Sequence, residues 1–169
     1  MSNQWTDANL RYRLTMALRK VYFMFPLRQA VLEKVRTSFP KIKLDGTPAM
    51  RKGKQMMTHH HECENCGRTK LSTGKIFVDH IDPVVPLGTP TSELGWSEYV
   101  ERLFCSMDNL WAICDICHDH KTTLENDIRK QWRYYKKGTQ SEQPPTKVGK
   151  DFANFKPRYE VKPKVPKNK

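Results

Sequence analysis

A chain of 169 residues has room for one domain of ordinary size. Lysine and arginine number 30 against 18 aspartates and glutamates, a net charge of +12. This excess favours a polyanionic partner, with nucleic acid the first candidate and a membrane surface the alternative. No apolar run approaches the roughly 20 residues that cross a bilayer, and the first five residues lack the order of a signal peptide. We therefore expect a cytoplasmic protein, without membrane association, whose thiols stay reduced.

Residues 1–39 form an N-terminal helical region in this interpretation. Apolar residues recur at spacings of three and four and predict one apolar helix face: Leu10, Leu14, Ala17, Leu18, Val21 and Phe25. Pro26 ends or kinks this helix, and Pro40 closes a second periodic piece. The basic residues between them either contact phosphates or form a solvated face.

Residues 40–57 are rich in proline, glycine, lysine and arginine, which predicts a basic linker. Its charge either grips a phosphate backbone or has no fixed role. At the other end, residues 138–169 hold seven lysines and one arginine against one aspartate and two glutamates, a net charge of +5. Such a segment buries too little apolar surface to order itself, so we expect a basic disordered tail.

The central domain, residues 58–137, begins with three consecutive histidines, His59 to His61. Two adjacent strand residues cannot both face one ion, so an exposed polar strand is the better interpretation. A β-branched and aromatic run over 76–80 predicts a strand that pairs with a second strand over 109–113. A short helix is predicted between them over 92–104, with Ser97 as a possible cap and Val100, Leu103 and Phe104 on its inner face. A longer helix is predicted from Cys114 to about Tyr134.

Two Cys-x-x-Cys pairs bracket the predicted hairpin: Cys63, Cys66, Cys114 and Cys117. Four thiolates suit a structural Zn²⁺, which takes a closed tetrahedral cage. The 47 residues between the pairs exceed the usual spacing of roughly 15–20, so the gap must contain structure of its own. The fifth cysteine, Cys105, is interpreted as small core filler.

A second, open metal site is the functional hypothesis. Asp79 and His118 combine a carboxylate with an imidazole, a mixed set that suits Mg²⁺, Mn²⁺, Ni²⁺ or Zn²⁺. His80 is the candidate base beside them, because imidazole accepts protons near pH 7. Asn109 falls on the partner strand, where its amide can hold the backbone or the ring of His80.

The chain resembles the HNH nuclease family, the ββα-metal group, over roughly residues 60–125. The matching segments are Cys63–Gly67, Val78–Pro83, Asn109–Cys114 and Cys114–Lys121, and the stretch 99–105 is similar to small HNH proteins from bacteriophages. The resemblance implies an α+β fold, a small ββα-metal hairpin-plus-helix core clamped by a four-cysteine zinc. It also implies His80 as the base, Asp79 and His118 as ligands of a catalytic divalent ion, and Asn109 as an orienting residue. His118 is preferred over His120, because helical geometry lets only one of them reach the ion.

These expectations make the chain a metal-dependent DNA endonuclease or nickase, phage-encoded and acting in DNA processing or packaging in the host cytoplasm. Its partners would be DNA, mainly through phosphates, and a phage packaging or replication protein. Two alternatives stay open. One is a non-catalytic zinc module that binds nucleic acid or a partner protein. The other is a homing or restriction nuclease, which needs a sequence-reading domain.

Overall fold

A computed structural model describes residues 6–148 of the chain. This part has an α+β fold with four α-helices and three two-stranded antiparallel sheets. At its centre, β5 (Ile76–His80) pairs with β6 (Leu110–Cys114), and α4 (Asp115–Lys136) follows β6 directly. The predicted pairing is confirmed, with Asp79 opposite Trp111 and His80 opposite Leu110.

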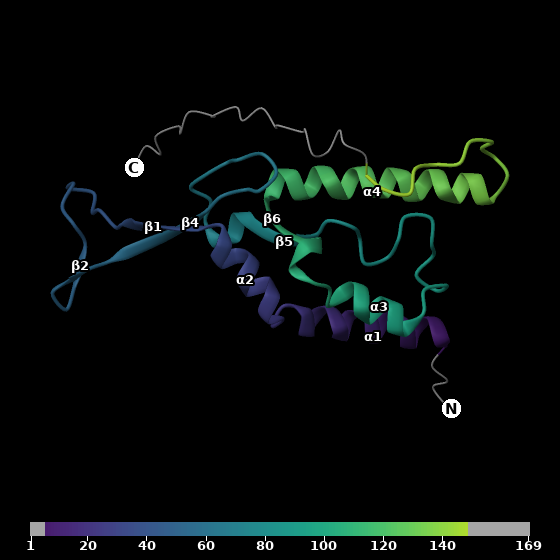
Figure 1. The fold of residues 1–169 in the computed structure, drawn as a ribbon, viewed down its shortest axis with the longest axis horizontal. Helices are drawn as coiled ribbons and strands as arrows, with labels where there is room; N and C mark the ends of the chain where they lie inside the picture. The colour runs from purple at the N-terminus through teal and green to yellow at the C-terminus, as the bar shows by residue number, and fades with distance from the viewer. Residues whose placement is uncertain (1–5, 149–169) are drawn as a thin grey trace, which may run out of the picture.

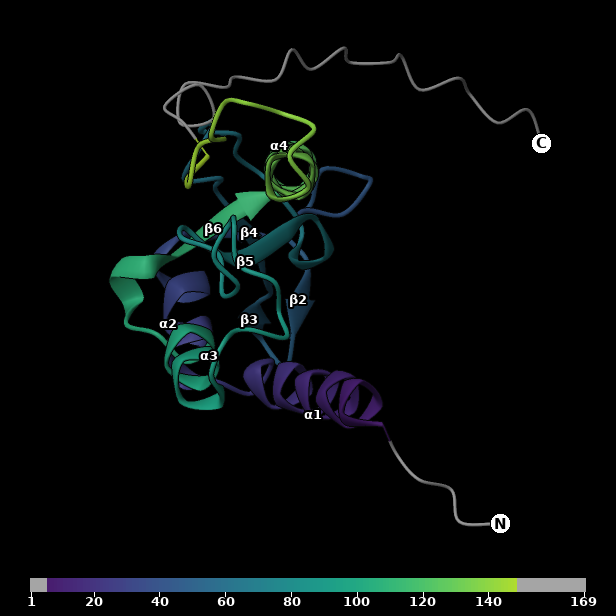
Figure 2. The same ribbon diagram turned by 90° about the vertical axis from the view of Figure 1, so that its right-hand side faces the viewer.

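The β5–β6 hairpin lies between two helical layers, as Figure 2 shows with α4 seen end-on. α4 packs against one face and α2 (Pro26–Lys34) against the other. Because both faces are covered, β6 is apolar along almost its whole length, and Ala112, Ile113 and Cys114 have no exposed surface. The core extends from this strand to Tyr99 and Leu103 on α3 (Trp96–Leu103).

The N-terminal helices differ from the sequence prediction at their ends. α1 (Asp7–Tyr22) stops before Pro26, as expected, and Pro26 occupies the first turn of α2, where its missing N–H costs nothing. The second helix ends at Lys34 instead of continuing towards Pro40. Strand pairing takes over the next residues and satisfies their backbone groups.

The predicted apolar face of α1 is used only at its C-terminal end. Leu10, Leu14 and Val21 are exposed, whereas Tyr22 is buried and Leu18 packs against the core. On α3, likewise, Tyr99 and Leu103 are buried while Val100, expected on the inner face, is exposed. Periodicity located these helices, but the position of neighbouring elements decided which residues are covered.

Residues of the predicted linker belong to a two-stranded arm that projects from the body (Figure 1). Its base pairs β1 (Arg36–Pro40) with β4 (Met57–His61), and its outer part carries the short strands β2 (Met50–Arg51) and β3 (Lys54–Gln55). The strand predicted for the histidines is confirmed, although His61 is buried at the base of the arm.

Two short 3₁₀ turns, Thr73–Lys75 and Met107–Asn109, lead into β5 and β6. Beyond α4, the first residues of the predicted tail return to the body, where the Trp132 indole N–H donates to the Pro145 carbonyl at 3.0 Å. Residues 149–169, which hold most of the tail expected to be disordered, lie outside the described residues. None of the helices in the described part is both long and apolar enough to cross a bilayer.

Candidate functional site

The four paired cysteines gather at one end of the hairpin. Their sulfur atoms all lie within 4.8 Å of one another, and the Cys66 and Cys114 sulfurs are 3.8 Å apart. Four thiolates around a tetrahedral Zn²⁺, each about 2.3 Å from it, have sulfurs about 3.8 Å apart. The cluster therefore has the dimensions to hold a metal ion such as Zn²⁺.

Local backbone structure prepares the first pair for this role. Gly67 has a φ of +69°, a conformation that residues with a Cβ rarely adopt, and its N–H donates to the Cys63 carbonyl at 2.9 Å. Two further donors point at sulfurs: the Cys114 N–H at Cys63 (3.2 Å) and the Asn65 amide at Cys117 (3.3 Å). Such donors stabilise thiolate charge, as metal-binding cysteines require.

Burial makes the thiols of the cluster difficult to ionise without a bound cation. Burial raises the pKa of Cys63 and of Cys117 above the usual thiol value because a thiolate loses its hydration there. A metal ion compensates for this loss by direct coordination. Cys105 is outside the cluster and packs at the edge of the core, as the sequence predicts.

A cleft of 840 Å³ lies between α1, the hairpin and α4. Asp79 and His80 line this cleft, together with Tyr22, Lys121 and Glu125. Its outer walls carry four basic side chains from α1 and α4: Arg19, Arg129, Arg133 and Lys136. The cleft thus combines a titratable floor with positively charged walls, which suit a phosphate-containing ligand.

His80 is held at the floor of this cleft with a defined tautomer. The residue is only 7% exposed, and Nε2 lies 3.0 Å from the Leu103 carbonyl oxygen. A carbonyl only accepts, so Nε2 carries the hydrogen and a neutral ring keeps its lone pair on Nδ1. Burial lowers the pKa of His80 below its usual value, against the opposing hydrogen bond to Leu103. The ring is therefore neutral near pH 7, the state that a general base requires.

Tyr22 forms the wall beside His80, with the two ring centroids 5.1 Å apart. The phenol is buried and its oxygen has no hydrogen-bond partner in the described part of the chain. Burial raises the pKa of Tyr22 to about 12, so the side chain stays neutral. It lowers the polarity around the imidazole and helps keep it uncharged.

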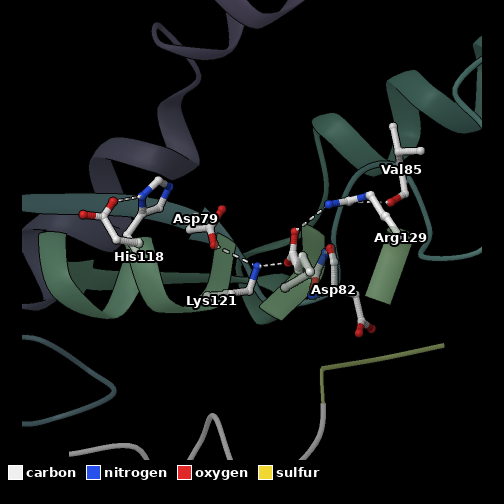
Figure 3. A network of polar contacts seen from close by, with 9 residues as sticks. Asp79, Asp82, Val85, His118, Lys121 and Arg129 are labelled. Carbon is white, nitrogen blue, oxygen red and sulfur yellow. Dashed lines mark hydrogen bonds and ion pairs between the residues drawn. The ribbon is translucent and has the colours of Figure 1, made fainter. Parts of the chain in front are cut away.

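Asp79 points to the face of β5 opposite to His80, towards α4. There it is the first member of a row of alternating negative and positive side chains (Figure 3). The Lys121 ammonium lies 2.9 Å from Asp79 Oδ2 and 2.5 Å from Glu125 Oε1. Arg129 continues the row, 3.3 Å from Glu125 Oε2, and also donates to the Val85 carbonyl at 3.2 Å. Lys121 is 4% exposed, so the two carboxylates compensate for its desolvation.

None of the expectations drawn from the sequence included this network. Lys121, Glu125 and Arg129 recur at four-residue spacing, which places them on one face of α4. That spacing is visible in the sequence, but charged residues at this period usually mark a solvated face. Only the packing of α4 on the hairpin reveals that the charges are turned inward.

His118 contacts the same face of β5 as Lys121, one helical turn earlier. Its ring stacks on Phe77 with centroids 5.0 Å apart, and Phe77 precedes Asp79 by two residues on the strand. His118 is half-buried and Nδ1 lies 3.7 Å from a carboxylate oxygen of Asp119. The structure therefore brings Asp79 and His118 to one face, while His118 is outside the lining of the cleft.

These residues do not fit a resident divalent ion as they are arranged. Within residues 6–148, the four cysteines are the only group of three or more metal-type ligands. Asp79 and His118 supply just two, and the Lys121 ammonium already neutralises the carboxylate. An ion at this place competes with a fixed positive charge.

Asn109 holds the turn that follows His80. Its side-chain oxygen accepts from the Asp82 N–H at 2.8 Å and its amide nitrogen donates to the Asp82 carbonyl at 3.2 Å. Its backbone carbonyl also accepts from the Ile81 N–H at 2.9 Å. Asn109 therefore holds the backbone of the two residues that directly follow His80.

We expect Asn109→Ala to lower the free energy of unfolding by about 1–3 kcal/mol, because Asp82 loses two partly buried hydrogen bonds. Urea unfolding measures this change. The matched control is Asn9→Ala on the exposed surface of α1, for which a change within about 0.5 kcal/mol is expected. Equal stabilities for the two variants contradict the role of Asn109 in holding this turn.

Comparison of the chain with protein-family models, curated proteins and solved structures gives no match.

Proposed function

We propose that this protein is a DNA endonuclease or nickase of the HNH type, in which His80 is the general base. The observation that carries the proposal is a buried, neutral imidazole of defined tautomer at the floor of a cleft with basic walls. The order of the Asp-His strand, Asn109 and the Cys-x-x-Cys-His segment along the chain supports the same assignment.

The proposed reaction is hydrolysis of a phosphodiester bond. His80 Nδ1 accepts a proton from a water molecule, and the water oxygen forms a bond to phosphorus. The bond from phosphorus to the 3′ oxygen then breaks, and the departing oxygen takes a proton from solvent. Arg19 and Arg133, which line the cleft, supply positive charge near the reacting phosphate, where negative charge increases in the transition state.

The divalent ion expected at Asp79 and His118 stays a prediction. Because Lys121 pairs with Asp79, no step of the reaction above depends on that ion. Lys121 also contacts Glu125, so it can keep one carboxylate partner if an ion takes the other. The nature of this ion, Mg²⁺, Mn²⁺ or Ni²⁺, is part of the experiment below.

Binding is proposed to depend mainly on phosphate contacts. Basic side chains line the cleft, and such contacts confer affinity without sequence specificity. A phage packaging or replication protein remains the predicted protein partner.

The second candidate is a non-catalytic zinc module that binds nucleic acid. It is favoured by the Asp79–Lys121 ion pair, which leaves the candidate ion site neutralised. In this case the same basic cleft binds phosphates without cutting them.

The two candidates are separated by incubating the zinc-loaded protein with supercoiled and linear DNA. Mg²⁺, Mn²⁺ or Ni²⁺ is added in parallel, with a reaction without added ion as reference. Nicking or linearisation supports the nuclease, and the ion series identifies the cofactor. Retarded DNA that stays intact under every condition supports the binding module.

Cleavage should depend on pH in a way set by His80. Since the pKa of His80 is lowered below about 6.5, its neutral form predominates above that pH. We expect a constant rate above about pH 6.5 and a tenfold loss per pH unit below the lowered pKa. Single-turnover cleavage rates across pH 5–8 measure this profile. A rate that continues to rise above pH 7 assigns the base to another group.

A further inference from the structure

The arm between β1 and β4 ends in two exposed turns that carry an unusual concentration of positive charge. We define the arm tip as residues 41–55. It holds five basic residues and one acidic residue, a net charge of +4: Lys41, Lys43, Arg51, Lys52, Lys54 and Asp45. All five basic side chains are exposed. The tip projects away from the layers that enclose the cleft (Figure 1).

The cations of the arm tip form no ion pair within the part of the chain that the structure describes. Among residues 6–148, no carboxylate lies within ion-pair distance of any of the five. The single acidic residue, Asp45, accepts hydrogen bonds from the Thr47 N–H (2.9 Å) and hydroxyl (2.6 Å). The charge of the arm tip is therefore available to an external anion.

The arm tip is built to hold its shape without a core. Lys52 and Gly53 both have positive φ, +49° and +73°, as the two central residues of a tight type I′ hairpin turn do. Backbone hydrogen bonds tie the two turns together: the Ala49 N–H donates to Lys41 and the Met56 N–H donates to Ala49, at 2.8 and 2.7 Å. Because this turn holds even a lysine at positive φ, the backbone positions of the basic residues around it are defined.

Apolar side chains lie exposed among the cations, with Ile42 at 52%, Met50 at 54% and Leu44 fully exposed. Lysine is depleted in protein–protein interfaces, so this mixture does not favour a protein partner. Nucleic acid accepts both kinds of group, because phosphates pair with the cations and sugar or base surfaces take the apolar groups.

We infer that the arm tip is a second DNA-binding surface, separate from the cleft, which contacts the phosphate backbone of duplex DNA. This inference rests on the proposed function for its choice of DNA and adds a docking element outside the reactive cleft. It assigns the arm to holding the duplex while a phosphodiester bond enters the cleft.

The test is the salt dependence of duplex binding, measured by fluorescence anisotropy with a labelled DNA duplex and zinc-loaded protein carrying His80→Gln. The arm variant is Lys43→Gln, Lys52→Gln and Lys54→Gln together. The control variant is Lys20→Gln, Lys130→Gln and Lys137→Gln, which removes the same charge from exposed positions outside the arm and the cleft lining.

We expect the arm variant to reduce the slope of log K against log [salt] by about 2.7, at about 0.9 per lost phosphate contact. The control variant should change this slope by less than about 0.9, which corresponds to one phosphate contact. Equal slopes for the two variants, or an unchanged slope in the arm variant, overturn the inference. Loss of self-association in the arm variant, seen by sedimentation velocity with DNA binding intact, also overturns it and assigns the arm to a second copy of the chain.

Cleavage is measured separately with proteins that retain His80. DNA binding that depends on the arm, in a protein that does not cut, keeps this inference and rejects the nuclease. DNA cleavage together with DNA binding that does not depend on the arm keeps the nuclease and rejects this inference.

Discussion

Cys114→Ser is expected to unfold the hairpin-plus-helix core. Cys114 has no exposed surface, ends β6 immediately before α4, and shares the four-sulfur cluster. Structural Zn²⁺ contributes about 10–16 kcal/mol in small zinc domains, which is comparable to the whole stability of a typical domain, about 5–15 kcal/mol. We therefore expect a metal ion at this cluster to account for most of the stability of this small core.

Circular dichroism melting, together with the zinc content of the purified protein, measures this effect. Cys105→Ser is the matched control, because Cys105 is a partly buried thiol outside the cluster. It should keep one zinc per chain and melt cooperatively. A Cys114→Ser protein that lacks zinc and melts like the wild type disproves the structural role of the cluster.

His80→Ala is expected to reduce cleavage by about 10²–10⁴-fold, the usual contribution of a general base. The four-cysteine cluster does not include His80, so we expect the zinc content to stay the same. The variant does lose the hydrogen bond to the Leu103 carbonyl, and some loss of stability is expected from this buried acceptor. Cleavage rates and urea unfolding are therefore measured on the same preparations.

Two controls separate chemistry from folding. His59→Ala removes an imidazole that is exposed on β4 and should leave the cleavage rate unchanged. Added imidazole should partly restore cleavage by His80→Ala, because a small base can enter the vacated position in the cleft. Unchanged nicking by a folded His80→Ala protein rejects His80 as the base.

The burial of His80 has a second consequence, for stability. Its folded pKa is lowered, so the unfolded chain binds more protons once the pH falls below about 6.5. The contribution of neutral His80 is therefore complete above that pH and is lost as the pH falls through the lowered pKa. Wild type should lose more stability than His80→Gln over this interval.

The hairpin and the four-cysteine cluster were predictable because each is indicated by a short, local sequence pattern. The strand 76–80 and its partner have β-branched and aromatic runs, and the two Cys-x-x-Cys pairs have the spacing of metal ligands. Apart from the polar strand at the histidines, the arm was not predictable by the same means. Its proline, glycine and lysine content resembles a linker, and its strands are two to five residues long, too short for a periodic pattern.

The sequence by itself determined the α+β character, the cysteine cluster that can hold a metal, and the position of the Asp-His pair at the end of a strand. These follow from residue type and short-range spacing, which act before distant segments meet. Only the tertiary structure decided that α4 turns Lys121 onto Asp79, that Leu103 sets the tautomer of His80, and that residues 41–55 form a charged arm. Each of these depends on contacts between segments far apart in the chain, whose geometry no local pattern encodes.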